Sequence, residues 1–153
     1  RRRATWLGNV LGTPGSRHDA RVVARAVDEV LADLRLGAIA ERPAGALPYG
    51  LQKRVELARA LVARPKVLIL DEPMAGMTAT EKAEMAADIR SAHARLGCTI
   101  VLIEHDVGIV MSLSDRVAVL DYGRKIADGT PAAVSTDPAV IDAYLGTVHA
   151  EAA

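Results

Sequence analysis

Hydrophobic residues recur at helical spacing in three stretches of the chain. These stretches run from about Asp19 to Leu36, from Gly50 to Ala63 and from Ala79 to Leu96. Apolar residues three and four positions apart share one face of a helix, so the pattern predicts three amphipathic helices. Gly37 and Gly97 are expected to stop the first and the third helix.

The second of these helices has a more specific expected pattern. Its apolar face is expected to carry Val55, Ala58, Leu61 and Val62. Its charged residues are expected to lie largely off that face, and they are Lys53, Arg54, Glu56 and Arg59. The Arg64-Pro65 pair ends the helix, because proline disfavours a helical conformation in the residue before it.

Two continuous apolar runs, Val67–Leu70 and Thr99–Ile103, interrupt the helical pattern. Such runs are typical of strands that are covered on both faces in a parallel sheet. A short helix over Val107–Leu113 leads to a third run, Val117–Leu120. The turn that follows this run predicts a hairpin into Lys125–Ala127.

The last part of the chain, from Thr130 to Gly146, predicts two short helices with Pro131 and Pro138 near their starts. Strands therefore alternate with helices along the chain. This order predicts an α/β fold with a mostly parallel sheet flanked by helices.

Composition places the chain in the globular class. Half of its 153 residues are hydrophobic, which is enough to bury a core. Nineteen basic residues balance nineteen acidic ones, so no bulk charge attracts nucleic acid or an anionic membrane. The longest apolar runs are too short to span a bilayer. The single cysteine, Cys98, excludes an internal disulfide and is expected to be a small buried residue.

Polar residues directly after the predicted strands are the first candidates for chemistry, because ligands of open α/β sheets bind at the carboxyl ends of strands. Asp71 and Glu72 follow the first strand, and His105 follows the second. Adjacent carboxylates on an extended segment point in different directions, so one can hold hydrated Mg²⁺ while the other orients or deprotonates water. Each feature alone is also common as a helix cap or a solvated residue.

A third candidate is the turn Leu47–Gln52, which leads directly into a helix. Gly50 allows close backbone approach, and the first N–H groups of the helix are donors at the positive end of its dipole. Such a helix start can bind a phosphate. Alone, the same turn serves equally well to begin a helix.

Taken together and in this order, the three features resemble the nucleotide-binding subunits of ATP-binding cassette (ABC) transporters. Leu47–Gln52 resembles the signature motif and is called the signature turn below. Val67–Pro73 resembles the Walker B strand, Ala75–Thr78 the D-loop and Ile103–Asp106 the switch-histidine segment. The resemblance covers most of the chain and is strongest from Leu47 to Gly146.

The resemblance implies a role for each matching residue. Glu72 would be the general base for the hydrolytic water, His105 would fix the γ-phosphate and Asp71 would hold Mg²⁺ through water. The signature turn would contact the ATP of a partner subunit through Pro48, Tyr49, Gly50, Leu51 and Gln52. Met77 and Thr78 would belong to the D-loop contact. ATP and Mg²⁺ are the implied cofactors.

The subtype follows from further segments. Tyr49-Gly50, Ser114–Val117, Asp128–Pro131 and Val140–Gly146 all resemble ATP subunits of branched-chain amino acid importers. The implied partners are a second nucleotide-binding subunit, transmembrane permease subunits and, indirectly, a periplasmic or extracellular solute-binding protein, with no nucleic acid. The implied location is the cytoplasmic face of the cell membrane.

The chain departs from the family pattern in several places. None of the four lysines directly follows a glycine, so the sequence contains no phosphate-binding Gly-x-x-x-x-Gly-Lys-Ser/Thr loop (Walker A). Gln52 is the only glutamine, so the family's glutamine loop is absent as well. Pro48 replaces the signature serine and so removes a hydroxyl that the family uses on the γ-phosphate. Thr78 stands where many members have aspartate in the D-loop.

These departures, together with the start at Arg1-Arg2-Arg3 without a methionine, indicate the C-terminal part of a longer P-loop NTPase domain. The three arginines are expected to form a solvated, frayed end. Residues 1–64 would be the remainder of the helical signature subdomain, 65–130 part of the RecA-like core and 131–153 a helical tail. The chain alone is expected to have negligible ATPase activity.

Three alternatives remain open at this point. The first is an ABC ATPase that works outside transport, in repair, chromosome organisation or translation. The second is a non-enzymatic dimerisation or regulatory module that supplies a signature motif to another subunit. The third, a small receiver-like α/β domain, leaves the signature turn and His105 unexplained.

Overall fold

The computed structural model describes residues 14–144, and the expectation for the three N-terminal arginines therefore lies outside the described residues. The chain forms two compact units. The first comprises the residues up to Ile69 together with Pro73–Val101. The second comprises Leu70–Glu72 together with the residues from Leu102 onward. The two units are described separately.

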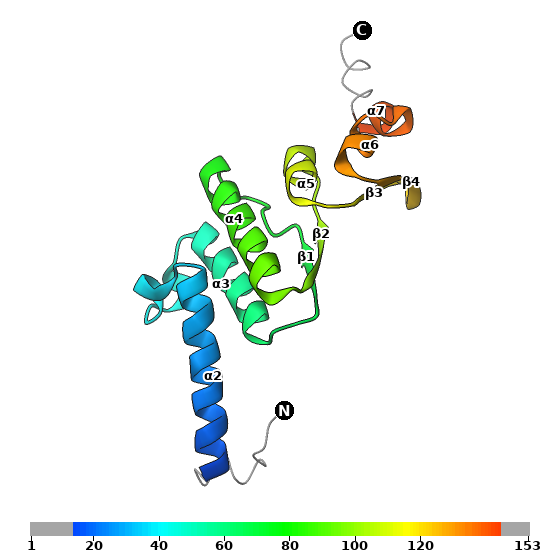
Figure 1. The fold of residues 1–153 in the computed structure, drawn as a ribbon. Helices are drawn as coiled ribbons and strands as arrows, with labels where there is room; N and C mark the ends of the chain where they lie inside the picture. The colour runs from blue at the N-terminus through cyan, green and yellow to red at the C-terminus, as the bar shows by residue number, and fades with distance from the viewer. Residues whose placement is uncertain (1–13, 145–153) are drawn as a thin grey trace. The chain divides into compact units, whose positions relative to one another are not determined.

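The first unit is built on three helices, α2 (Pro14–Asp33), α3 (Tyr49–Val62) and α4 (Ala79–Leu96). Two short 3-10 turns, Gly37–Ile39 and Ala44–Ala46, lie between α2 and α3. Helix α3 packs against both α2 and α4 (Figure 1). The three predicted helices are present, and buried residues of this unit include Leu34, Leu57, Leu61, Met85 and Ile89. The expected stop of the first helix is wrong, because α2 ends at Asp33 and Gly37 begins a 3-10 turn instead. The left-handed conformation of Arg35, with φ of 56°, turns the chain out of the helix before Gly37.

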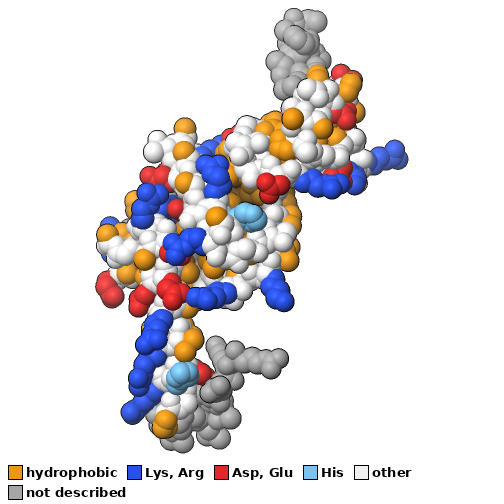
Figure 2. Space-filling view, in the orientation of Figure 1, with side chains coloured by type: hydrophobic (Ala, Val, Ile, Leu, Met, Phe, Trp, Pro, Cys, Tyr) orange, Lys and Arg blue, Asp and Glu red, His pale blue; other side chains and the backbone are white. Residues whose placement is uncertain are grey.

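Helix α2 is the most exposed of the three. Val30 is its only buried residue among those the structure describes, and Val22 and Val23 are more than half exposed. Basic side chains lie along this helix (Figure 2), and its arginines recur at every fourth position as Arg17, Arg21 and Arg25. Most of the helix is therefore a solvated surface, and its C-terminal end joins the core.

Helix α4 has well-defined signals at both ends. Thr78 caps its N-terminus by accepting a hydrogen bond from the Glu81 N–H, and the Glu81 side chain returns a bond to the Thr78 N–H. Gly97 ends the helix with φ of 59°, a left-handed conformation that glycine adopts without a Cβ clash. These local signals explain why the predicted bounds of this helix are confirmed to the residue.

Strands β1 (Val67–Asp71) and β2 (Thr99–Ile103) pair with each other. The Thr99 N–H donates to the Lys66 carbonyl at the start of the ladder, and the Glu72 N–H donates to the Ile103 carbonyl at its end. The starts of the two strands are thus bonded to each other, and so are their ends. The two strands therefore run parallel, as predicted from the apolar runs.

The expectation that both faces of these strands are covered is wrong. Leu68 is buried, but Val67 and Ile69 are 56% and 65% exposed, and Val101 is 44% exposed. Burial therefore alternates along β1, which is the pattern of a strand covered on one face. A continuous apolar run does not distinguish a strand that is covered on both faces from one whose second face lacks a cover in this chain.

The second unit contains an antiparallel hairpin of β3 (Val117–Asp121) and β4 (Arg124–Gly129). Helices α5 (Val107–Leu113), α6 (Pro131–Ser135) and α7 (Pro138–Tyr144) complete it. Its core consists of Val117, Val119, Val134 and Val140, with Val110, Met111, Ile126 and Ala127 packed against them. The hairpin and the short helices confirm the predicted elements.

Sheet topology in the described residues consists of one parallel pair and one antiparallel pair, in two separate sheets. In place of the one mostly parallel sheet that was expected, the described residues form two sheets of two strands each. Among residues 14–144, no helix combines the length and the apolar character needed to cross a membrane. The expected division at residues 64 and 130 follows the family motifs and stays a prediction.

Candidate functional site

The acidic pair lies where β1 ends. Asp71 is the last residue of the strand, and Glu72 follows it with φ of 44°, a left-handed conformation that is rare for a residue with a side chain. The Glu72 N–H donates to the Ile103 carbonyl over 2.9 Å, which fixes the backbone in this turn. Glu72 therefore lies in a turn and not on the extended segment for which the different directions of the two carboxylates were predicted.

His105 lies close to Glu72 in the second unit. Its Nδ1 atom is 3.7 Å from the Glu72 Oε1 atom, which is longer than a hydrogen bond but within reach of an ion pair if the imidazole is protonated. Both side chains are well exposed, at 71% for His105 and 54% for Glu72. The fold thus brings together two groups that are 33 positions apart, and both remain accessible to a ligand.

Asp71 and Glu72 offer hard carboxylate oxygens of the kind that Mg²⁺ prefers. Magnesium is usually held by one or two carboxylates, with waters and substrate phosphates completing its shell. The donor chemistry at the end of β1 therefore fits this ion. Within residues 14–144, no group of three or more His, Cys, Asp or Glu is arranged to hold a metal.

The signature turn lies in the first unit, at the N-terminus of α3. Pro48 occupies the N-cap position and makes no side-chain capping bond. The Gln52 side chain donates to the Leu47 carbonyl over 2.8 Å and closes the turn. The Lys53 ammonium lies 5.7 Å from the centre of the Tyr49 ring, within the range of a cation–π contact. Gln52 thus closes the turn from within, and Lys53, the next residue, adds a contact to its tyrosine ring.

The D-loop segment, Ala75–Thr78, precedes α4 in the same unit. Met77 is buried, at 7% exposure, and its N–H donates to the carbonyl of the fully buried Met74. Thr78 is exposed, and its hydroxyl is engaged in the α4 cap. The segment is thus anchored on two methionines, and the roles predicted for Met77 and Thr78 stay predictions.

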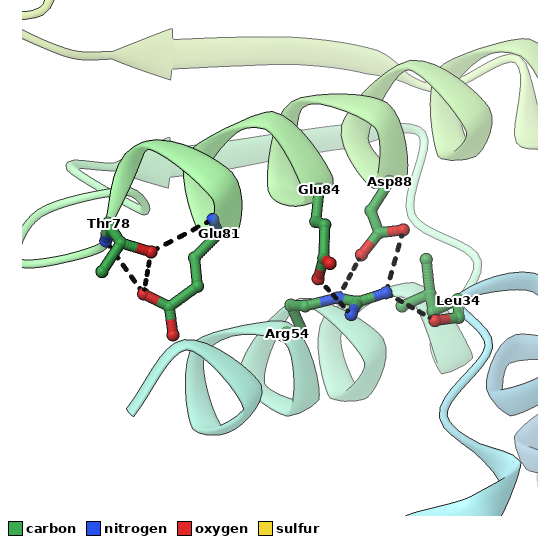
Figure 3. Close-up of polar contacts among 6 residues, drawn as sticks. All are labelled: Leu34, Arg54, Thr78, Glu81, Glu84 and Asp88. Atoms are coloured by element: carbon green, nitrogen blue, oxygen red, sulfur yellow. Dashed lines mark hydrogen bonds and ion pairs between the residues drawn. The ribbon is translucent and has the colours of Figure 1, made fainter. Parts of the chain in front are cut away.

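Arg54 corrects an expectation from the sequence. Instead of lying off the apolar face of α3, it is buried, at 7% exposure. Its guanidinium donates to Asp88 through Nε over 2.7 Å, to Glu84 over 2.9 Å and to the Leu34 carbonyl over 2.8 Å (Figure 3). Asp88 is itself 3% exposed. Helix periodicity places Arg54 beside Leu57, Ala58 and Leu61, and only the acids of α4 make that position acceptable for a cation.

Glu81 is a residue that the sequence analysis missed. It closes the α4 capping box, and it also lies against Gly50 in the signature turn, because a Cβ built on Gly50 would lie 2.3 Å from its Oε1 atom. The Thr78-Ala79-Thr80-Glu81 spacing is the usual sequence pattern of a capping box and could have identified the first role. The second depends on how α3 packs against α4.

The predicted site residues thus form two groups. Asp71, Glu72 and His105 lie in the second unit, and the signature turn and the D-loop segment lie in the first. Each group is placed by its own local structure. The roles assigned to these residues stay predictions.

Comparison with protein-family models gives two matches. Residues 4–75 match the family described as ABC transporter. Residues 124–150 match the family described as branched-chain amino acid ATP-binding cassette transporter. The two matched ranges lie at opposite ends of the chain.

Curated relatives give the same picture. The chain is 40% identical over 141 residues to the high-affinity branched-chain amino acid transport ATP-binding protein BraF of Pseudomonas aeruginosa. It is 42% identical over 146 residues to the corresponding protein LivG of Escherichia coli K12. In both cases the alignment covers 92% of the chain and 55% of the relative. The chain therefore spans about half the length of the relatives it matches.

Solved structures confirm an ABC fold. A structure of the ADP conformation of MJ1267, an ATP-binding cassette of an ABC transporter, matches with a TM-score of 0.73 at 32% identity, over 81% of this chain and 50% of that one. The structure of cbiO1 from Clostridium perfringens matches with a TM-score of 0.70 at 34% identity, over 82% and 51%. The α/β fold is thus confirmed as part of an ABC ATP-binding cassette. The chain therefore belongs to the ABC transporter family, and the match of residues 124–150 and these two relatives are of the branched-chain amino acid type.

Proposed function

We propose that this chain supplies the signature, Walker B and switch-histidine part of an ATP-hydrolysing subunit that energises a branched-chain amino acid importer. The observation that carries the proposal is the approach of His105 to Glu72 at the ends of two adjacent parallel strands. The branched-chain amino acid type of the relatives supports the choice of solute.

Each residue of the second unit has a distinct chemical task in this proposal. Glu72 accepts a proton from the attacking water, and a positioned general base contributes about 10²- to 10⁴-fold to a rate. His105 donates a hydrogen bond to the γ-phosphate. Asp71 would hold Mg²⁺ through water, and the ion would neutralise charge on the phosphates.

The first unit acts on a different nucleotide. The signature turn presents the N–H groups at the start of α3, and these are suited to phosphate oxygens because they lie at the positive end of the helix dipole. Pro48 offers no hydroxyl there, so the contact relies on backbone donors. The proposed partner is a second nucleotide-binding subunit whose ATP meets this turn, with permease subunits at the membrane.

A chimera tests the catalytic part of the proposal. The chain is joined to the part of Escherichia coli LivG that it does not cover, and Mg-ATP hydrolysis and ATP binding are measured. We expect the chimera to hydrolyse ATP, and we expect Glu72→Gln to lower kcat by about 10²- to 10⁴-fold while ATP binding is kept. Glu41→Gln, which neutralises an exposed carboxylate outside the site, is the matched control. Hydrolysis at the control's rate in the Glu72→Gln chimera would remove Glu72 from this role.

The chain by itself and the intact cell test the remaining parts. We expect no detectable heat when Mg-ATP is titrated to millimolar concentration into the chain alone, because it has no Gly-x-x-x-x-Gly-Lys loop. In Escherichia coli cells that lack LivG, the chimera is expected to restore leucine uptake. A chimera that hydrolyses ATP without restoring uptake would contradict the proposed solute or partners, and leave the ATPase assignment in place.

A further inference from the structure

The signature turn and the D-loop segment approach each other at two glycines. A Cβ on Gly50 would lie 2.3 Å from the Glu81 carboxylate, and a Cβ on Gly76 would lie 3.3 Å from the Tyr49 ring. Gly50 and Tyr49 belong to the signature turn, whereas Gly76 and Glu81 lie in and directly after the D-loop segment. Gly50 of the signature turn therefore lies against a side chain of α4, and Gly76 of the D-loop segment lies against a side chain of the signature turn.

The Glu81 carboxylate lies at the start of α4, and it also lies close to the start of α3. Its Oε2 atom accepts hydrogen bonds from the Thr78 N–H over 2.9 Å and from the Thr78 hydroxyl over 2.8 Å. The Thr78 bonds, with a smaller contribution from the Gly50 N–H, hold the pKa of Glu81 below its usual value. A negative group is stabilising at a helix N-terminus, and Pro48 supplies none to α3. Glu81 thus brings a carboxylate from α4 against the start of α3.

The second contact needs glycine for two reasons. Gly76 has φ of 73°, which residues with a side chain rarely adopt, and a Cβ there would press on the Tyr49 ring. Tyr49 is half exposed and also receives the Lys53 ammonium at 5.7 Å from its ring centre. The ring therefore lies close to the backbone of the D-loop segment and within cation–π range of a side chain of its own helix.

We propose that Glu81 and Tyr49 are positioning residues that lock the signature turn to the D-loop segment, so that the two segments move as one body. The consequence for activity rests on the proposed function: a nucleotide phosphate that contacts the signature turn would also fix the D-loop segment. The lock itself is a property of the chain without nucleotide.

A double-mutant cycle tests the Glu81 contact in the chain as it stands. Gly50→Ala forces the carboxylate out of its place, so we expect it to lower Tm in the wild-type chain. In the Glu81→Ala background the space is vacant and alanine is the better helix former, so the same substitution is expected to leave Tm unchanged or raise it. The Glu41→Ala background is the control, and there Gly50→Ala should act as in the wild type. An equal loss of Tm in all three backgrounds would overturn the lock.

The hydrogen-exchange rate of the Gly50 amide is a local measurement that loss of the α4 cap alone should change little. With Glu81→Gln, which keeps the size of the side chain, we expect exchange of the Gly50 amide to accelerate about tenfold, because the charged acceptor is lost. Thr78→Ala removes the side chain that caps α4 but keeps the carboxylate beside Gly50, so it should accelerate that amide much less. Equal acceleration in both variants would show that Glu81 acts only as a cap of α4, and would reject the proposal.

The functional consequence is measured in the LivG chimera. There Glu81→Ala is expected to lower kcat, by up to about 10²-fold, while Glu41→Ala leaves it unchanged. If the unsubstituted chimera does not hydrolyse ATP, the proposed function fails, and the lock is still decided by the cycle and the exchange rates. If the chimera hydrolyses ATP and Glu81→Ala leaves kcat unchanged, the lock has no role in the reaction and that part of the inference is wrong.

Discussion

Arg54 shows at the scale of one residue how an isolated helix pattern misleads. The position is apolar by periodicity, yet it holds a guanidinium that makes contacts with Asp88, Glu84 and the Leu34 carbonyl. A buried ion pair contributes little net stability relative to well-packed apolar residues. Removal of one partner, however, leaves the other charge buried without compensation, which is strongly destabilising. The acids that make Arg54 acceptable come from α4, some thirty positions away.

Arg54→Met is therefore expected to destabilise the first unit by about 3–5 kcal/mol, because Asp88 is left buried and unpaired. Urea unfolding followed by circular dichroism measures the change. Arg59→Met removes an exposed arginine from the same helix and should change stability by less than about 0.5 kcal/mol. The double variant Arg54→Met, Asp88→Leu should recover part of the loss. Equal effects of Arg54→Met and Arg59→Met would contradict this account.

Asp128 is the most strongly perturbed acid in the second unit. Hydrogen bonds from Arg116 and Lys125, each 2.7 Å long, lower the pKa of its carboxyl to about 2. A depressed pKa contributes stability that is present above the unfolded value, near 4, and is lost as pH falls through about 2. The contact joins β4 to the residue before β3.

Asp128→Asn is expected to lower Tm at pH 7, and the difference from the wild type should shrink as pH falls from about 4 to about 2. Thermal unfolding across that range measures it. Asp115→Asn, which neutralises an exposed neighbouring acid, is the control and should show no such convergence. A difference in Tm that stays constant down to pH 2 would mean that the Arg116 and Lys125 contacts do not depend on the charge of Asp128.

The β3–β4 hairpin shows at the scale of an element how turn chemistry decides a fold. Asp121 pairs with Arg124, which leaves a loop of two residues, Tyr122 and Gly123, with φ of 43° and 78°. Positive φ at both positions matches the right-handed twist of the strands. Glycine suits this conformation, whereas tyrosine adopts it under strain.

We expect opposite effects at these two positions. Gly123→Ala should destabilise the second unit by about 1 kcal/mol, because alanine is strained in the left-handed region. Tyr122→Asn should stabilise it by a few tenths of a kcal/mol, because asparagine tolerates that region and the tyrosine ring is fully exposed. Chemical denaturation of both variants measures the change in the free energy of unfolding. A change of the same sign in both variants would contradict the assigned turn.

Elements with local signals were predictable from the sequence. The C-terminal end of helix α4 was predictable because Gly97 marks it, and α6 begins at a proline that suits the first helical turn. Glu72 and His105 were each placed after a strand by the sequence, and the 3.7 Å between their side chains is a finding of the structure. The partners of Arg54 and the second contact of Glu81 were not predictable, since both depend on how helices distant in sequence meet.

At the scale of the whole molecule, the exposed side of the strand pair is the main departure from a closed fold. In the first unit Val67, Ile69 and Val101 expose 44–65% of their surface. Contiguous exposed apolar residues on a short strand pair favour association with other chains. The sequence could not show this, because the same apolar run also suits a strand that is covered on both faces.

Ile69→Thr combined with Val101→Thr is therefore expected to reduce self-association at micromolar concentration while secondary structure is kept, because threonine retains β propensity with a polar surface. Sedimentation velocity and circular dichroism measure the two quantities. Val22→Thr with Val23→Thr on the exposed helix α2 is the control and should leave association unchanged. Unchanged self-association in the strand variant would show that the exposed side of β1 and β2 does not mediate it.

The two strand pairs also differ in the length of chain that each must close. The β3–β4 hairpin closes over two residues, whereas the β1–β2 ladder closes over α4 and the segments around it, from Lys66 to Thr99. A hairpin forms in about 1–10 μs, and closure of a longer loop costs more chain entropy before any contact is gained. Refolding should therefore order the hairpin before the parallel ladder. The acidic pair and His105 lie at the end of that ladder, so the candidate catalytic groups come together only in the slower step.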